Sequence, residues 1–307
     1  MKILMILTGG TICTTAGSNG HRSADTDTVK SVMLERLIHE YPQYKDVEID
    51  SVVALNTLSE NMTIAKLNQL IEVLQAQSYE GYDAVFIGHG TDTLHITAPL
   101  ISMLFKGMDI PVFMIVSNKG LEYEEANGIS NMGRSLEYVE SGIKPGTYVV
   151  YRNSDGISYL HKAERLMECS DYSEDFFSLP DRVPEVDAPA EKPLLNRIRK
   201  LNDSVLIVKP YAGIRYDRYN LDGVKAVLHG TYHSYTLCTE GQSETSAVYL
   251  FDKCKEAGID FYLSPCNGEE YTYTSTETLL TRGACPLYGY TLGGAYAYLL
   301  IKYADYY

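Results

Sequence analysis

Two short segments of this 307-residue chain combine threonines with glycines in a way that could support chemistry. Residues 8–11 read Thr-Gly-Gly-Thr, and residues 88–93 read Gly-His-Gly-Thr-Asp-Thr. A threonine hydroxyl can attack a carbonyl carbon when another group accepts its proton, and the N–H groups of a glycine turn can hold the oxyanion that forms. A threonine in such a turn more often only caps a helix. Two such turns that meet at one pocket would form a hydroxyl-based site for acyl transfer.

Each segment directly follows a run of apolar residues that predicts a buried β-strand. These runs cover residues 2–7 and 84–87, and an apolar helix that ends near Lys106 follows the second turn. Other strand-like runs lie at 47–54, 112–116 and 148–151, and helical patterns lie at 63–77 and 127–138. This alternation is typical of βαβ units, so we expect a doubly wound parallel sheet of the α/β class. Ligands of such sheets bind at the carboxyl ends of the strands, where both threonine turns would lie.

The chain is predicted to form two domains joined by a linker. Between residues 179 and 194 four prolines lie among acidic residues, a composition typical of a linker. A second α/β pattern follows, with strands at 205–208, 226–228 and 261–263 and helices at 244–257, 275–281 and 292–302. We therefore expect an N-terminal domain over 1–182 that carries the threonine site, a linker over 183–200, and a smaller C-terminal α/β domain over 201–307.

The composition narrows the class of partner. The formal net charge is −14, which repels nucleic-acid phosphates and anionic lipid, so we expect no nucleic-acid or membrane partner. No apolar run is long enough to cross a bilayer, and no secretory signal is recognisable. The six cysteines are scattered without a Cys-x-x-Cys pair, which predicts free thiols in the cytoplasm and no metal site.

Neither threonine segment matches a nucleotide-binding motif, but the pair resembles the two signatures of the bacterial-type L-asparaginase/glutaminase family. The similar stretches are residues 8–12, 59–62, 89–93, 126–131, 162–180, 209–213 and 264–266. The resemblance implies a two-domain α/β protein that hydrolyses asparagine to aspartate and ammonia through a threonine-bound acyl intermediate. It implies no metal or organic cofactor, a small amino-acid amide as substrate, and a homodimer or homotetramer.

Carried over by position, the family roles fall on four residues. Thr11 would be the nucleophile, and Thr91 would position or activate the attacking group. Asp92 would pair with the α-ammonium of the substrate, and Ser59 would hold its α-carboxylate. Ion pairing and hydrogen bonding of this kind would orient a small amino acid in a closed pocket.

The family also has a lysine hydrogen-bonded behind the second threonine, and two alignments compete for it. We expect Lys162 in this role, although Tyr159 stands where the family has an arginine three residues earlier. The distance from Lys162 to Asp175 is also longer than is usual in the family, so this alignment requires a loop insertion.

The alternative alignment uses Arg165 as that arginine and places Glu168 at the lysine position. A carboxylate at that position would lie near Asp92. Two like charges raise the pKa of one of the two carboxyl groups, and no ammonium group is supplied. Lys119 is a further alternative.

Two other positions depart from the family pattern. No tyrosine lies between Ile12 and His39, where the family has one in a mobile loop, and His21 falls close to its place and could act as an acid or base. Glu60 stands where Gln or Ser is common, and its charge should favour a substrate with a blocked carboxylate or an additional amine.

Three alternatives to an asparaginase therefore remain. One is a same-fold relative that acts on a different amide, and another is a catalytically weak amino-acid-binding protein. An RNA-directed amidotransferase subunit shares this fold family, but the acidic charge of the chain counts against it.

Overall fold

A computed structural model describes residues 1–10, 15–16, 22–23, 26–180, 183, 193–266, 268 and 273–307. The predicted residues Thr11 and His21 and part of the predicted linker, 184–192, lie outside the described residues. The chain forms two compact units. The first comprises Met1–Ser178 with Pro189–Arg197, and the second comprises Leu179–Ala188 with Ile198–Tyr307. The linker over 183–200 stays a prediction.

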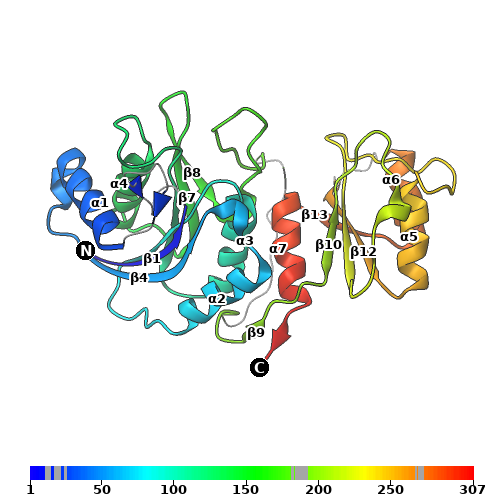
Figure 1. Ribbon diagram of the computed structural model, residues 1–307, viewed down its shortest axis with the longest axis horizontal. Coiled ribbons are helices and arrows are strands. Elements are labelled where there is room, and N and C mark those ends of the chain that lie inside the picture. Colours follow the sequence, from blue (N-terminus) through cyan, green and yellow to red (C-terminus); the bar gives the residue numbers. More distant parts are fainter. Residues whose placement is uncertain are drawn as a thin grey trace. The chain divides into compact units, whose positions relative to one another are not determined.

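The first unit is built on a six-stranded sheet in the order β4-β1-β5-β6-β7-β8 (Figure 1). Its strands are β1 (Lys2–Gly9), β4 (Glu48–Thr57), β5 (Ala84–Gly88), β6 (Pro111–Ile115), β7 (Gly146–Arg152) and β8 (Ser158–Lys162). All neighbours pair in parallel except β7 and β8, which form an antiparallel edge. A short antiparallel pair joins β2 (Thr15–Ala16) to β3 (Arg22–Ser23). The predicted doubly wound parallel sheet is confirmed, with an antiparallel last strand that the sequence did not predict.

In the described part of this unit, four α-helices and three 3-10 turns accompany the strands; the last of them follows β8, and the others lie between strands. They are α1 (Thr26–Glu40), η2 (Pro42–Tyr44), η3 (Ser59–Asn61), α2 (Ile64–Gln75), α3 (Leu94–Phe105), α4 (Gly128–Glu140) and η4 (Ala163–Arg165). Apolar residues of α1 and α4 share one core cluster with alternate residues of β1, β5 and β6. Side chains alternate between the faces of a strand, and the intervening residues of these strands are also buried. They face α2 and α3, which cover the other face of the sheet (Figure 1).

The turn after β5 leads to the opposite face of the sheet from the turns after its two neighbouring strands, β1 and β6. The connections after β1 and β6 lead to α1 and α4 on one face, whereas the connection after β5 leads to α3 on the other. Neighbouring strands whose connections leave toward opposite faces open a crevice at their carboxyl ends, and this is where α/β proteins bind ligands. Residues 89–93 therefore have such a crevice on each side.

Because α1 and α4 lie on the same face of the sheet, one of the crossover connections is left-handed. The β1–α1–β4 and β6–α4–β7 connections progress in opposite directions across the sheet, yet their helices share a face. They therefore have opposite hands, so one of them breaks the usual right-handed rule for parallel strands.

The second unit contains a four-stranded parallel sheet in the order β10-β11-β12-β13 (Figure 1). Its strands are β10 (Val205–Val208), β11 (Ala226–Gly230), β12 (Asp260–Cys266) and β13 (Cys285–Tyr288); its helical elements are η5 (Tyr216–Arg218), α5 (Ala247–Glu256), α6 (Thr274–Arg282) and α7 (Leu292–Lys302). An antiparallel pair joins β9 (Ile198–Lys200) to β14 (Asp305–Tyr306). The smaller C-terminal α/β domain is thus confirmed as a fold.

In the described part of the chain, none of the helices combines the length and apolar character that a bilayer-spanning segment needs.

Candidate functional site

The turns after β1 and β5 meet through two glycines. The N–H of Gly10 donates to the carbonyl of Thr57 at 2.9 Å, which fixes the end of β1 against β4. A Cβ added to Gly10 would lie 2.5 Å from the backbone nitrogen of Gly90, so the two backbones are in direct contact. Gly10 also has φ +74°, a conformation that favours glycine. The residues that immediately precede Thr11 and Thr91 are therefore in contact, although Thr11 itself lies outside the described residues.

Ser59 and Asp92 form a hydrogen-bonded unit beside this contact. Ser59 is 3% exposed at the start of η3, and its hydroxyl donates to Asp92 Oδ2 at 2.8 Å. The same hydroxyl oxygen accepts the N–H of Asp92 at 3.1 Å, and the hydroxyl of Thr93 donates to the Ser59 carbonyl at 3.0 Å. A Cβ on Gly90 would lie 2.5 Å from Ser59 Oγ, so only glycine fits against the Ser59 side chain at position 90. The structure thus brings together the two residues expected to hold the amino-acid part of a substrate.

His89 shapes the β5 turn from within the core. Its side chain is fully buried, and its ring Nδ1 lies 2.7 Å from the carbonyl of Gly90. The backbone N–H of His89 donates to the carbonyl of Ile115 at 2.9 Å. Burial lowers the pKa of His89, so the ring is neutral at neutral pH. Thr91 is half-buried and Asp92 is exposed, so the side chains that follow this rigid turn are accessible.

Lys162 is not brought to this group. Because β8 runs antiparallel, Lys162 pairs with Tyr148, which lies level with Phe113 and, one strand further, with Phe86 in the middle of β5. It is also three strands from β5, or about 14 Å at the usual strand spacing. The expectation that Lys162 lies behind Thr91 therefore does not agree with the strand register.

The segment after β8 brings Glu168 to the carboxyl end of the sheet instead. Ser102, near the end of α3, donates to Glu164 at 2.9 Å, and His95, in the first turn of α3, lies 3.9 Å from Glu168. Residues 164–168 therefore run antiparallel to α3, toward the turn that carries the threonine. Arg165 is buried in η4, which packs on α3. This geometry favours the alternative alignment, with Arg165 and Glu168, over the one with Lys162.

Cys169 lies in a strongly negative part of this region. Its Sγ donates to the carbonyl of Asp175 at 3.2 Å. Burial, followed by the negative charges of Asp175, Asp92, Glu168 and Glu174, raises the pKa of its thiol to about 11. The thiol is therefore protonated at neutral pH, and four carboxylates act on one half-buried position. Sequence reasoning did not single out Cys169, because the carboxylates around it come from separate segments.

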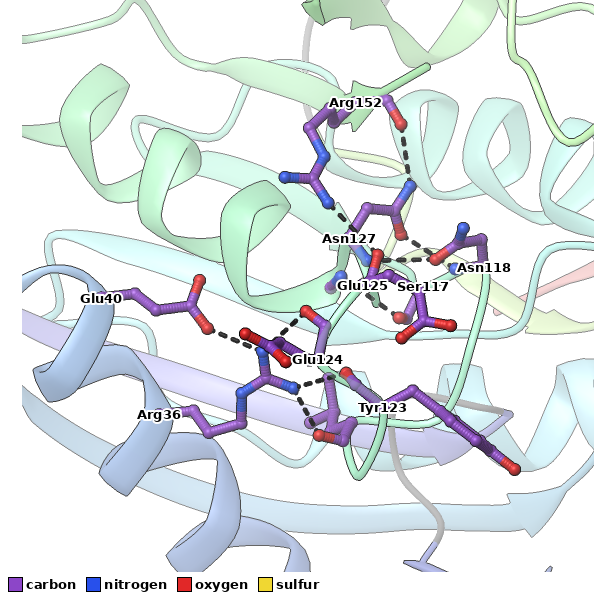
Figure 2. A network of polar contacts seen from close by, with 11 residues as sticks. Arg36, Glu40, Ser117, Asn118, Tyr123, Glu124, Glu125, Asn127 and Arg152 are labelled. Carbon is purple, nitrogen blue, oxygen red and sulfur yellow. Dashed lines mark hydrogen bonds and ion pairs between the residues drawn. The ribbon is translucent and has the colours of Figure 1, made fainter. Parts of the chain in front are cut away.

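The remaining predicted residues lie outside the Ser59–Asp92 unit. Glu60 is exposed in η3, directly after Ser59. Lys119 forms an ion pair with Glu125 at 2.9 Å within the loop that follows β6. Figure 2 shows how this loop is held: Arg36 of α1 donates to carbonyl oxygens of the loop, including that of Tyr123 at 2.9 Å.

A second His-Gly-Thr sequence occurs at the end of β11 in the other unit. His229 is fully buried with its Nδ1 2.6 Å from the carbonyl of Gly230, as at the β5 turn. Here, however, the other ring nitrogen of His229 bonds to the hydroxyl of Tyr216 at 2.8 Å. The hydroxyl of Thr231 donates to the carbonyl of Pro265 at 2.6 Å, so it already has an acceptor.

The family model described as "Asparaginase, N-terminal" matches residues 2–195. This match covers more than half of the chain, which therefore belongs to the asparaginase family.

Solved asparaginases share the fold over nearly the whole chain. L-asparaginase I from Vibrio cholerae is similar with a TM-score of 0.72 and 18% identity, over 99% of this chain and 94% of that one. The thermostable L-asparaginase from Thermococcus kodakarensis gives a TM-score of 0.71 and 17% identity, over 98% and 92%. At these identities the likeness concerns the fold alone.

The curated relatives carry a different name, that of a glutamyl-tRNA(Gln) amidotransferase component. A relative from Methanococcus maripaludis (strain C5) is 24% identical over 170 residues, which are 54% of this chain and 40% of that protein. Its counterpart from Methanosphaera stadtmanae is 24% identical over 248 residues, which are 71% of this chain and 56% of that protein. This chain thus spans about half the length of the curated relatives that it matches.

Proposed function

We propose that this protein hydrolyses the side-chain amide of asparagine or of a related small amino acid. The observation that carries the proposal is the Ser59–Asp92 unit, built at a crevice of the sheet beside the contact between Gly10 and Gly90. The exposed carboxylate of Asp92 would pair with the α-ammonium of the substrate, and the Ser59 hydroxyl would bind its α-carboxylate.

The proposed reaction proceeds through a threonine ester. Thr11 Oγ adds to the amide carbon, its proton is transferred to the amide nitrogen, and the C–N bond breaks so that the nitrogen leaves as ammonia. Water then cleaves the ester to release the free acid, with Thr91 positioning the attacking group. The role of Thr11 rests on the family signature and on the contact of its neighbour Gly10 with Gly90.

Glu168 favours a second candidate within the same class. The Glu168 carboxylate at the first turn of α3 adds negative charge near Asp92, and the exposed Glu60, next to Ser59 in the chain, adds more. Such a field weakens the binding of a free α-carboxylate and strengthens the binding of an additional ammonium. The alternative substrate is therefore an amide of a decorated amino acid, bearing a blocked carboxylate or a second amine. A protein that binds amino acids without turnover is the remaining alternative.

The first experiment measures ammonia release by the purified protein from L-asparagine and L-glutamine. We expect release by the wild type and none by Thr11→Ala or Asp92→Asn. Lys162→Met is the matched control and should keep the wild-type rate, since Lys162 lies about 14 Å from β5. Stabilisation by aspartate without ammonia release would favour the binding protein, because a ligand of the folded state raises the melting temperature. If the protein shows no ammonia release and no stabilisation, asparagine and glutamine are not its substrates.

The assembly and location also belong to this proposal. The family resemblance favours a homodimer or homotetramer, and the scattered cysteines favour the cytoplasm. A role as one component of a tRNA-dependent amidotransferase is the alternative that the names of the curated relatives raise. The net charge of −14 opposes direct contact with tRNA phosphates.

A further inference from the structure

The turn that carries Ser59 is bonded to a lysine in the first turn of the next helix, α2. The ammonium group of Lys66 donates to the carbonyl of Asn61, the last residue of η3, at 2.9 Å. The backbone N–H of Lys66 donates to the hydroxyl of Thr63, the N-cap residue of α2, at 3.3 Å. Because Ser59 is the first residue of η3, Lys66 holds the short turn on which the Ser59 hydroxyl is presented.

Lys66 is also bonded to the end of β4, where this strand meets the glycines of β1. Its ammonium group donates to Thr57 Oγ at 2.6 Å, and the Thr57 hydroxyl donates in turn to the carbonyl of Leu58 at 3.2 Å. The carbonyl of Thr57 accepts the N–H of Gly10 at 2.9 Å. One side chain therefore joins η3 to the strand end that precedes Thr11.

The positive charge of Lys66 is not neutralised by a carboxylate. Its two acceptors are a hydroxyl oxygen and a carbonyl oxygen, and in the described part of the chain no acidic side chain forms an ion pair with it. An ammonium group has three N–H donors, so one donor remains beyond these two bonds. Lys66 is half-buried, so its charge is less screened by solvent than that of an exposed lysine.

This charge has the opposite sign to the acidic groups beside Ser59. Asp92 bonds the Ser59 hydroxyl, and Glu60 follows Ser59 in the chain. Both carboxylates attract the α-ammonium of an amino acid and repel its α-carboxylate. Lys66 is bonded to the same turn, two residues after Ser59, and its charge attracts an α-carboxylate there.

We propose that Lys66 makes the site selective for amino-acid amides with a free α-carboxylate. Its hydrogen bonds position Ser59, and its charge opposes those of Asp92 and Glu60 where the α-carboxylate binds. The inference rests on the proposed function, which places the α-carboxylate beside Ser59. It deepens that function, because it favours asparagine itself over an amide whose carboxylate is blocked.

The test is calorimetric titration of the full chain with two ligands that differ only at the α-carboxyl group. L-Aspartate has a free α-carboxylate, and L-isoasparagine has an uncharged α-amide in its place. The titration is done at about pH 6.5, below the usual pKa of an α-ammonium group, so that both ligands keep that charge. We expect the wild type to bind L-aspartate at least about tenfold more tightly than L-isoasparagine. In Lys66→Met this ratio should fall below about threefold, mainly through weaker binding of L-aspartate.

The ratio of the two affinities separates the proposed role from a general loss of structure. A damaged fold would weaken both ligands alike and leave the ratio at its wild-type value. Lys66→Gln is a second neutral variant, and it decides the outcome if Lys66→Met does not fold. Lys45→Met is the matched control and should keep the wild-type ratio. It removes one positive charge at an exposed position before the amino end of β4, about 30 Å from Thr57 at the usual rise of a strand.

Three results would overturn the inference: a wild-type ratio in the neutral Lys66 variants, equal binding of the two ligands by the wild type, or binding of neither. Ammonia release from asparagine, measured on the same samples, tests the proposed function separately. Release together with an unchanged ratio in Lys66→Met would leave the hydrolysis standing and remove the role of Lys66. A ratio that depends on Lys66, without release by the wild type, would support the role of Lys66 and contradict the hydrolysis.

Discussion

The strand ends of β5 and β11 carry the same His-Gly-Thr sequence but differ in what surrounds it. In both, a buried histidine bonds the carbonyl of the following glycine through Nδ1, at 2.7 and 2.6 Å. After β11, the hydroxyl of Thr231 is bound to a neighbouring carbonyl. After β5, the chain continues into Asp92, which bonds the buried Ser59 of the adjacent connection. The shared sequence is therefore a way to end a buried strand in a tight turn, and the aspartate and serine distinguish the candidate site.

The largest expected difference concerns the two threonines. Thr91→Val should lower the rate of ammonia release by about 10³-fold, because a group that positions or transfers a proton contributes on this scale. Thr231→Val should change that rate by less than about twofold and cost only about 1 kcal/mol of stability, the usual net worth of one hydrogen bond. Steady-state kinetics of both variants check this. Equal losses would show that the His-Gly-Thr turn, and not its surroundings, sets the activity.

The pH dependence of stability tests the two histidines. Burial lowers the pKa of His229 to about 4, so between pH 6.5 and 4 the unfolded chain binds a proton that the folded chain does not. The free energy of unfolding should therefore fall as the pH falls through this window, by about 3 kcal/mol in total. His229→Gln should flatten the dependence of the urea midpoint on pH.

His89→Gln is the companion variant, because burial also lowers the pKa of His89. It should flatten the dependence in the first unit. An unchanged slope in either variant would contradict a neutral buried ring at that strand end.

Ser59→Ala should raise KM for asparagine about tenfold to a hundredfold, with a smaller change in kcat. The variant removes hydrogen bonds to a charged group, which are worth about 1.5–3 kcal/mol. Ser264→Ala is the matched control, since Ser264 is a buried serine on β12 of the other unit. A rise in KM of similar size in the control would contradict the assignment of Ser59 to substrate binding.

The smallest expected effect is that of Tyr216→Phe. It leaves the Nε2 of His229 without its hydrogen-bond partner and should lower the free energy of unfolding by about 1–2 kcal/mol at pH 7. His89 already has no described partner at Nε2, so the variant makes the second turn resemble the first. Urea titration measures the loss, and ammonia release should not change. An unchanged urea midpoint would show that this bond contributes nothing.

The sequence predicted those elements whose burial leaves a pattern in the residues themselves. The strands β1 and β5 are continuous apolar runs because both faces of the sheet are covered, and β6, β7 and α4 were predicted for similar reasons. The Ser59–Asp92 unit could be predicted only by resemblance to a family, since 33 residues separate its members.

Lys162 shows what the sequence could not give. The strand β8 is short and mostly exposed, and its sequence has no pattern that indicates an antiparallel pairing with β7. That reversal moves Lys162 away from the carboxyl end of the sheet. The place of Glu168 depends equally on distant contacts, with Ser102 holding the start of its segment and His95 lying at its end. Strand partners of this kind are set by packing across the sheet.

The glycines at the end of β1 and in the turn after β5 act as a single steric unit. A Cβ at Gly9 would lie 2.2 Å from the carbonyl oxygen of Thr57, and one at Gly10 would meet the backbone of Gly90. Because all three positions already carry the smallest possible side chain, no exchange at one of them can be compensated at another. A side chain at any one of these glycines would therefore force the backbone of the strand end or of the facing turn to move.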